Sequence, residues 1–360
     1  MFVAWRDLRF AKGRFALMGA VVVLITLLVG LLSGLTAGLG EQNISAITGL
    51  PADKIVFAAP GDGQSLSYAN SAISETQQRR WAETPGVTGA EPLGIATTKA
   101  TAGNRSAGIS VFGVRTGSAL APDSGRITGD SVVLSTSAAE DLGVRSGETI
   151  TVAGRPLTVG AVTGDAWFSH TPVVWAALDV WARTAPPSGG EPAATVLALN
   201  TATDADLAAT DRAAGTQTVS KSDSLSAIGS YTSENGSLQL MRGFLFAISA
   251  LVIGAFFTVW TIQRSGDIAV LKALGASTAF LLKDALGQAV VLLVGGTAVG
   301  TGLAVGLGAV VAGSAVPFLL TPATVLVPAV VMILLGALGA ALSVRRITSV
   351  DPLTALGSAR

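Results

Sequence analysis

The stretch RSGDIAVLKALGAS, residues 264–277, divides the most apolar half of this 360-residue chain. Residues 243–263 before it form an uncharged run of 21 positions, and residues 285–344 after it contain no charge in 60 positions. A helix rises about 1.5 Å per residue and a bilayer core is about 30 Å thick, so the first run crosses a membrane once and the second crosses it twice. The second run breaks at AVPFLLTP, where Pro317 and Pro322 bracket a turn. The predicted spans are 243–263, 285–314 and 323–344.

A fourth apolar run lies near the start of the chain. Residues 15–40 are uncharged over 26 positions and follow the basic flank WRDLRFAKGR. The run is too long for the apolar core of a secretory signal, and no clean small-x-small site ends it, so we predict a retained span. The predicted fold class is a membrane α-helical protein with four transmembrane helices and a mixed α+β extracellular domain, residues 41–242, inserted between the first and second helices.

Charge is segregated along the chain although the net charge is zero. Residues 41–240 hold 12 Lys/Arg against 19 Asp/Glu, and the remainder holds 11 against 4. The basic residues of the remainder flank the spans, in a predicted interfacial helix (1–14), in the 264–284 connection and in the 345–360 tail. Positive residues near span ends stay in the cytoplasm. The sequence therefore predicts a plasma membrane protein with both termini inside and the acidic domain outside.

Several activities are excluded by composition. The chain has no cysteine and a single histidine, His170, so a zinc site or a thiol nucleophile is not expected. It has no Gly-x-Ser-x-Gly pattern and no Gly-Lys-Ser or Gly-Lys-Thr, which a serine hydrolase and a Walker A loop need. We predict no enzyme activity, no intrinsic cofactor or metal, and no nucleic-acid partner.

The outer segment shows short β-branched runs separated by turn residues. The predicted strands are SVVL (131–134), ETITV (148–152), PLTVGAV (156–162) and PVVWAAL (172–178). One predicted helix starts at Ser135 and ends near Gly143, a second covers ETQQRRWAETPG, and a third starts within 220–230 and continues into the second span.

The opening stretch itself predicts an amphipathic helix. Ile268, Leu271 and Leu274 recur every three residues, and Gly275 is expected to end the helix. Two interpretations fit this pattern: an interfacial helix that merely returns the chain, or a helix that presents its apolar ridge to a partner protein.

A resemblance favours the partner. RSGDIAVLKALGAS resembles the cytoplasmic coupling segment of MacB/FtsX-type (type VII) ABC transporter permeases, and three further stretches resemble theirs: WRDLRFAKGR, VVLSTSAAEDLGVRSGETITVAGRPLTVGAV and the tail VRRITSVDPLTALG. The resemblance implies a permease homodimer embedded in membrane lipid and a separate ABC ATPase subunit that binds the ATP. It assigns ATPase coupling to Arg264, Asp267, Ile268, Leu271, Lys272, Leu274 and Gly275.

Within this family the chain resembles most the permeases of the HrtB haem-exporter type, which implies haem as the substrate. Iron accepts Tyr and Met ligands and Arg242 could meet a propionate, so the candidate substrate residues are Tyr231, Glu234, Met241, Arg242 and Met18. Position alone also fits Tyr231 as an interfacial anchor and the two methionines as lipid-facing packing. His170 is interpreted as a surface or partly packed residue.

Two features leave alternatives open. Gly30, Gly34 and Gly38 have the spacing of a close helix contact, which we assign to the dimer, although a contact within one subunit has the same pattern. Trp167, Trp175 and Trp181 either build the core of the outer domain or line a hydrophobic surface. The alternative functions are an FtsX-like signal relay to an extracellular partner and export of a lipid, peptide or antimicrobial compound.

Overall fold

The computed structural model describes residues 12–184, 193–202, 206–263, 266, 270, 272, 274–311 and 316–345. The described residues fall into two compact units, one within 1–38 and 237–360 and the other within 39–236. We call them the membrane unit and the outer domain.

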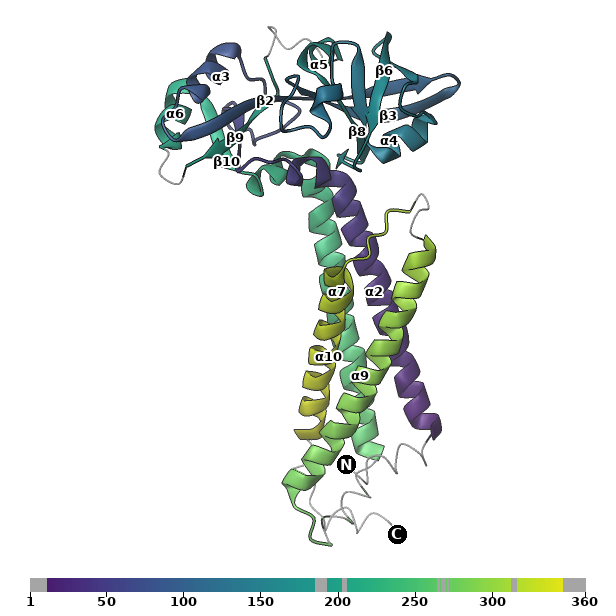
Figure 1. The fold of residues 1–360 in the computed structure, drawn as a ribbon. Helices are drawn as coiled ribbons and strands as arrows, with labels where there is room; N and C mark the ends of the chain where they lie inside the picture. The colour runs from purple at the N-terminus through teal and green to yellow at the C-terminus, as the bar shows by residue number, and fades with distance from the viewer. Residues whose placement is uncertain are drawn as a thin grey trace. The chain divides into compact units, whose positions relative to one another are not determined.

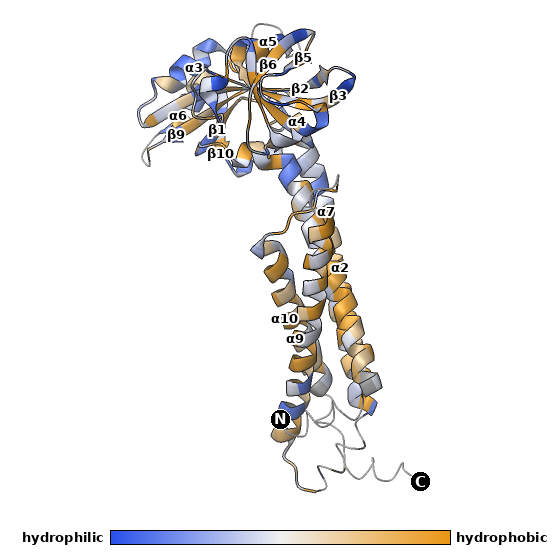
Figure 2. Ribbon diagram, turned by 45° about the vertical axis from the view of Figure 1, so that its right-hand side comes forward, coloured by the Kyte–Doolittle hydropathy of each residue, from blue (hydrophilic) through white to orange (hydrophobic). Residues whose placement is uncertain are grey.

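Four long helices supply the membrane unit, and each is long and apolar enough to cross a membrane. Figure 2 shows apolar residues along all of them. The predicted fold class is confirmed. The first two helices extend past the unit boundary, because each continues into polar turns that belong to the outer domain. The helices are α2 (Lys12–Thr48), α7 (Gly229–Gln263), α9 (Thr278–Val311) and α10 (Pro322–Arg345).

The helices of the membrane unit approach closely at glycines. A Cβ atom at Gly300 of α9 would lie 2.8 Å from Thr26 Cβ on α2. A Cβ atom at Gly339 of α10 would lie 3.2 Å from Gly254 Cα on α7. Small residues allow this approach where water provides no driving force for association. A buried cluster fills the remaining space and includes Met18, Val22, Val29, Ile253, Phe257 and Leu293.

The outer domain is built on a ten-stranded sheet, in which nine strands follow the order β10-β1-β9-β2-β3-β8-β4-β6-β5 and β7 pairs with β8 off this path. An additional pairing of β2 with β5 closes the part from β2 to β5 on itself. The long β2 serves both parts: residues 87–93 pair with β9, and residues 94–102 pair with β3. The strands are β1 (Lys54–Ala58), β2 (Val87–Ala102), β3 (Arg105–Val114), β4 (Ser131–Leu134), β5 (Thr149–Val152), β6 (Arg155–Val162), β7 (Trp167–Phe168), β8 (Thr171–Ala177), β9 (Val196–Thr201) and β10 (Thr216–Ser220).

Short helices cover the sheet, and their ends follow capping rules. Ser135 caps α4 by accepting from Ala138 N, and Gly143 ends it in the left-handed conformation at φ 66°. Ser74 and Gln77 form a capping box on α3. In Figure 1, α3 and α6 lie beside one end of the sheet, and α4 and α5 lie beside the other. The helices are α3 (Glu75–Ala82), α4 (Thr136–Leu142), α5 (Leu178–Thr184) and α6 (Leu207–Ala214).

Of the three tryptophans Trp167, Trp175 and Trp181, two lie in the core of the outer domain. Trp175 on β8 and Trp181 on α5 are 3% and 2% exposed. Trp181 packs over Gly94 and Gly113, where any side chain would overlap its ring. Trp167 is half-buried. Trp175 and Trp181 therefore build the core and do not line an exposed hydrophobic surface.

The start of α7 agrees with the prediction. The helix was expected to begin within 220–230 and to continue into the second span, and it begins at Gly229, after a separate 3₁₀ turn, Asp223–Ala227. The break is at Ile228, whose backbone is extended at φ −87° and ψ 108°. Its side chain is buried in the outer core, which holds the chain in this conformation.

Candidate functional site

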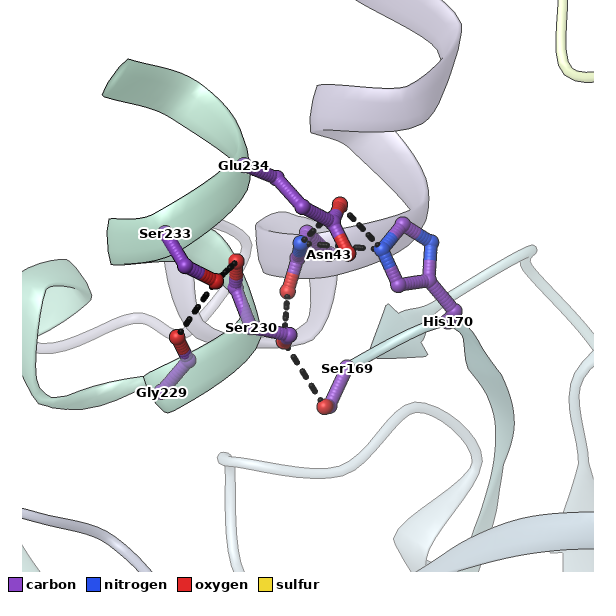
Figure 3. Close-up of polar contacts among 7 residues, drawn as sticks. All are labelled: Asn43, Ser169, His170, Gly229, Ser230, Ser233 and Glu234. Carbon is purple, nitrogen blue, oxygen red and sulfur yellow. Dashed lines mark hydrogen bonds and ion pairs between the residues drawn. The ribbon is translucent and has the colours of Figure 1, made fainter. Parts of the chain in front are cut away.

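A polar network joins the sheet of the outer domain to the end of α2 and the start of α7 (Figure 3). Its centre is Glu234, whose Oε2 lies 2.7 Å from Nε2 of His170 and accepts a hydrogen bond of 3.3 Å from Nδ2 of Asn43. Asn43 is buried, whereas the side chains of His170 and Glu234 are 29% and 43% exposed. The network is therefore reachable from solvent on one side.

The hairpin between β7 and β8 places His170 in this network. Trp167 pairs with Pro172 and Phe168 with Thr171, which leaves Ser169 and His170 as a two-residue turn. Both residues have left-handed φ values, 49° and 61°. Two-residue hairpins favour Asn-Gly for this geometry, and other residues cost about 1–2 kcal/mol each. The contacts of the turn must offset that cost.

The turn is held by hydrogen bonds from both main chain and side chains. Ser169 N and His170 N donate to the carbonyl oxygens of Asn43 and Gln42, both at 3.0 Å. The hydroxyl of Ser169 lies 2.8 Å from that of Ser230, which in turn donates to Oδ1 of Asn43 at 2.7 Å. This bond fixes the orientation of the Asn43 amide and turns its Nδ2 toward Glu234.

The predicted substrate residues are divided between the two units. Glu234 belongs to the polar network, and Tyr231 is half-buried against the outer core. Met241 is 48% exposed and Arg242 is half-buried, and both lie on α7 within the membrane unit. Met18 is 7% exposed and packs in the core of the membrane unit, so neither lipid nor cargo can reach it easily there.

The other tyrosine of the chain, Tyr68, is part of the core of the outer domain. Tyr68 is 4% exposed and donates to Ser224 Oγ at 2.9 Å. Burial raises the pKa of this phenol well above its usual range, which opposes ionisation. In the part of the chain that the structure describes, no group of three or more His, Cys, Asp or Glu side chains could hold a metal ion.

The glycines of the first helix face the interior of the chain. A Cβ atom at Gly30 would lie 2.8 Å from Ala304 Cβ, and side chains at Gly34 and Gly38 would overlap Phe318 and Pro317. Leu319 N donates to Gly34 O at 3.1 Å. These contacts lie within one subunit, which is the alternative that the spacing left open, and a role of this face in the dimer stays a prediction. The helix α9 and the 316–321 segment fill the space that small residues leave.

Family comparison accounts for both units. Residues 15–217 match the MacB-like periplasmic core domain, and residues 240–352 match the FtsX-like permease C-terminal domain. The chain belongs to the MacB/FtsX family of ABC transporter permeases. The predicted family is confirmed, and the permease role with it.

Relatives of this permease align over nearly the whole chain. It is 27% identical to the putative hemin transport system permease protein HrtB of Staphylococcus haemolyticus over 364 residues, 99% of each chain. It is 24% identical to an uncharacterized ABC transporter permease of Mycobacterium bovis over 367 residues, again 99% of each. A structural alignment with the solved periplasmic region of MacB from Actinobacillus actinomycetemcomitans covers 50% of this chain and 94% of the MacB chain. The TM-score is 0.36 and the sequence identity is 13%.

The predicted coupling segment of the permease is described in part. Arg264, Asp267, Ile268 and Leu271 lie outside the described residues. Leu274 N donates to Val270 O, and Gly275 follows at φ 92°, a conformation that suits glycine at a helix end. The side chain of Leu274 is 79% exposed. The coupling role of this segment stays a prediction.

Sequence reasoning missed the polar network. His170 was interpreted as a surface or partly packed residue, and its partners Asn43 and Glu234 are 127 and 64 positions away. One signal was present: Ser169-His170 stands between two short apolar stretches, WF and TPVVWAA, at the spacing of a two-residue hairpin. The sequence contains nothing that names the partners.

Proposed function

We propose that this permease works as a homodimer with a separate ATPase and exports haem, or another hydrophobic compound, from the membrane. One observation carries the substrate: relatives named as putative hemin transport permeases align over 99% of both chains at 24–27% identity. An alignment of this extent includes the spans, the outer domain and the connections between them.

The distribution of apolar surface supports a cargo taken from the membrane. Among the described residues, all the large exposed hydrophobic side chains lie in the membrane unit, including Leu28, Phe244, Leu251 and Val310. The outer domain buries its own large hydrophobic residues. A hydrophobic compound would therefore meet the membrane helices first, since the outer domain offers no exposed apolar patch in its described part.

Transport by this permease needs an external source of energy. The chain has no Gly-Lys-Ser or Gly-Lys-Thr, so it lacks the loop that would cradle the phosphates of ATP. A partner ATPase would act on the 264–284 connection from the cytoplasm, where the chain termini also lie in this proposal. The helix α7 begins in the outer domain and ends next to this connection, so it links the two parts of the permease.

Haem export is tested with cells that lack their own haem exporter. The permease and its ATPase are expressed together, and growth in external haem and the haem content of the cells are measured. We expect tolerance and a low haem content only when both proteins are present. A variant of the ATPase without its Walker A lysine is the matched control, because it keeps the complex and removes hydrolysis.

Purified complex distinguishes the alternatives. Titration with haem is expected to give a Soret band and to stimulate ATP hydrolysis. A complex that stays colourless, and whose hydrolysis and host tolerance ignore haem, would overturn the haem substrate. Stimulation by another hydrophobic compound would then identify an exporter of that class, whereas ATP-dependent activation of an extracellular enzyme would identify a signal relay.

A further inference from the structure

The end of the central strand β8 is attached to two helices at a single turn. β8 pairs with β3 on one side and with β4 on the other, so it lies inside the sheet. At its start, Ser169 and His170 contact residues 42–43 of α2 and residues 230 and 234 of α7. All of these residues belong to the outer domain.

The central acceptor of this contact is the carboxylate of Glu234. Asn43 Oδ1 already accepts from Ser230, so its Nδ2 is the group that faces both Glu234 and His170. A bond of 2.7 Å between His170 Nε2 and a carboxylate oxygen needs a hydrogen on Nε2. The 3.1 Å approach of Asn43 Nδ2 to that same nitrogen then adds no bond. Glu234 therefore holds both donors.

This arrangement makes α7 the element that joins the other two. Loss of the Glu234 carboxylate would release the side chain of His170 and Nδ2 of Asn43 from that residue, whereas Ser230 of α7 would still contact Ser169 and Asn43 Oδ1. The main-chain bonds of Ser169 and His170 to residues 42–43 would remain, so the turn would stay on α2. The side-chain contacts thus control one connection, between α7 and the hairpin, and leave the fold of the hairpin to its own backbone bonds.

We propose that His170 is a positioning residue of the transport cycle, which through Glu234 couples the first turns of α7 to strand β8 so that helix and sheet move together. The inference rests on the proposed function, because only transport gives this movement a role. It does not depend on the identity of the cargo.

The experiment uses the full permease with its ATPase in lipid vesicles and compares His170→Ala, Glu234→Ala and the double variant. Two quantities are measured: cargo exported per ATP hydrolysed, and hydrogen exchange of segments 166–173 and 229–236 with and without ATP. In the wild type, ATP is expected to change exchange in both segments together. Each single variant is expected to lose this concerted change and about tenfold of the export per ATP, with no further loss in the double variant.

Two further variants separate positioning from stability. His170→Gln keeps an N–H that can reach Glu234 and is expected to recover most of the coupling. Asn235→Ala, on the same turn of α7 but outside the network in Figure 3, is the matched control and is expected to behave as wild type. If an alanine variant does not fold, Glu234→Gln, which keeps the volume and removes the charge, takes its place.

The outcomes are distinguishable from failure of the proposed function. If the wild type exports no haem but its two segments still respond to ATP together, and His170→Ala abolishes this, the coupling stands and the cargo is wrong. If His170→Ala keeps both the concerted exchange and the export per ATP, the inference is overturned. Equal losses of stability, ATP hydrolysis and export, with unchanged export per ATP hydrolysed, would also overturn the inference.

Discussion

The ring of Phe318 fills the space that a side chain would need at Gly34. Phe318 lies in the segment between α9 and α10, and the same ring also covers Gly308 on α9. The adjacent Leu319 N donates to Gly34 O at 3.1 Å. Residues 317–319 are therefore packed into the contact between α2 and α9, which makes them a structural part of the membrane unit.

The substitution Gly34→Ala is expected to expel this ring. The added methyl group overlaps Phe318, and overpacking of this kind destabilises by about 1–3 kcal/mol. Thermal unfolding of the purified permease in detergent measures the effect. Gly302→Ala on α9 is the control, since nothing lies within 4 Å of its Cβ position. The double variant with Phe318→Ala should recover part of the loss, and a stability equal to wild type for Gly34→Ala alone would contradict the packing.

Local signals in the sequence predicted part of the outer domain well. The strand at 131–134 and the helix from Ser135 to Gly143 were placed correctly because a side-chain cap and a left-handed glycine mark the ends of that helix. The hairpin of β2 and β3 was missed. Its strands contain many Gly and Ala residues, which are depleted in strands, so they are defined by pairing across the sheet and not by local propensity.

Non-local contacts explain why the site was harder to predict than the fold. Uncharged runs locate the membrane helices but not their ends, because α7 starts fourteen residues before the uncharged run at Gly243. The small-residue spacing of Gly30, Gly34 and Gly38 was recognised, yet spacing alone cannot name the partner helix. The partners of His170 come from two other elements, and only the folded chain brings them together.

The buried phenol of Tyr68 predicts a loss of stability at alkaline pH. Burial raises the pKa of Tyr68, with the bond to Ser224 opposing this in part, so the folded domain holds the proton while the unfolded chain releases it above about pH 10. The contribution is present below that pH and decreases as pH rises further. Tyr68→Phe removes it.

Denaturation of the full permease at several values between about pH 9 and pH 11 measures this effect. The free energy of unfolding of the wild type should fall relative to that of Tyr68→Phe by up to about 1.4 kcal/mol per pH unit above pH 10. Tyr231→Phe, at a half-buried position, is the control and should leave the alkaline decrease in place. Parallel curves for wild type and Tyr68→Phe would show that the phenol ionises freely.

The orientation of the permease can be tested with unusual clarity because the chain has no cysteine. We expect a cysteine at Asn104, in the exposed turn between β2 and β3, to react with a membrane-impermeant maleimide in intact cells. A cysteine at Leu274, which is 79% exposed, should react only after the membrane is opened. Labelling of Leu274→Cys in intact cells would place the connection outside and would end the proposal that an ATPase acts there.

The same connection predicts a specific defect in ATPase binding. The side chain of Leu274 is mostly exposed in the membrane unit. Such exposure fits a residue that packs against a partner protein, and it also fits a residue that faces lipid. Leu274→Ser should weaken binding of the ATPase to the permease in detergent by about tenfold, the usual effect of losing one apolar anchor. Val310→Ser, at an 82% exposed position near the end of α9, is the matched control and should bind normally.

Reversal of charge at Asp267 and at Lys272 should each weaken binding in the same assay. The loss should be larger at low salt, because unlike charges across an interface attract most strongly when they are not screened. If Leu274→Ser and both charge reversals bind the ATPase as the wild type does, the helix only returns the chain along the membrane surface, and the site where the ATPase acts must be sought elsewhere in the permease.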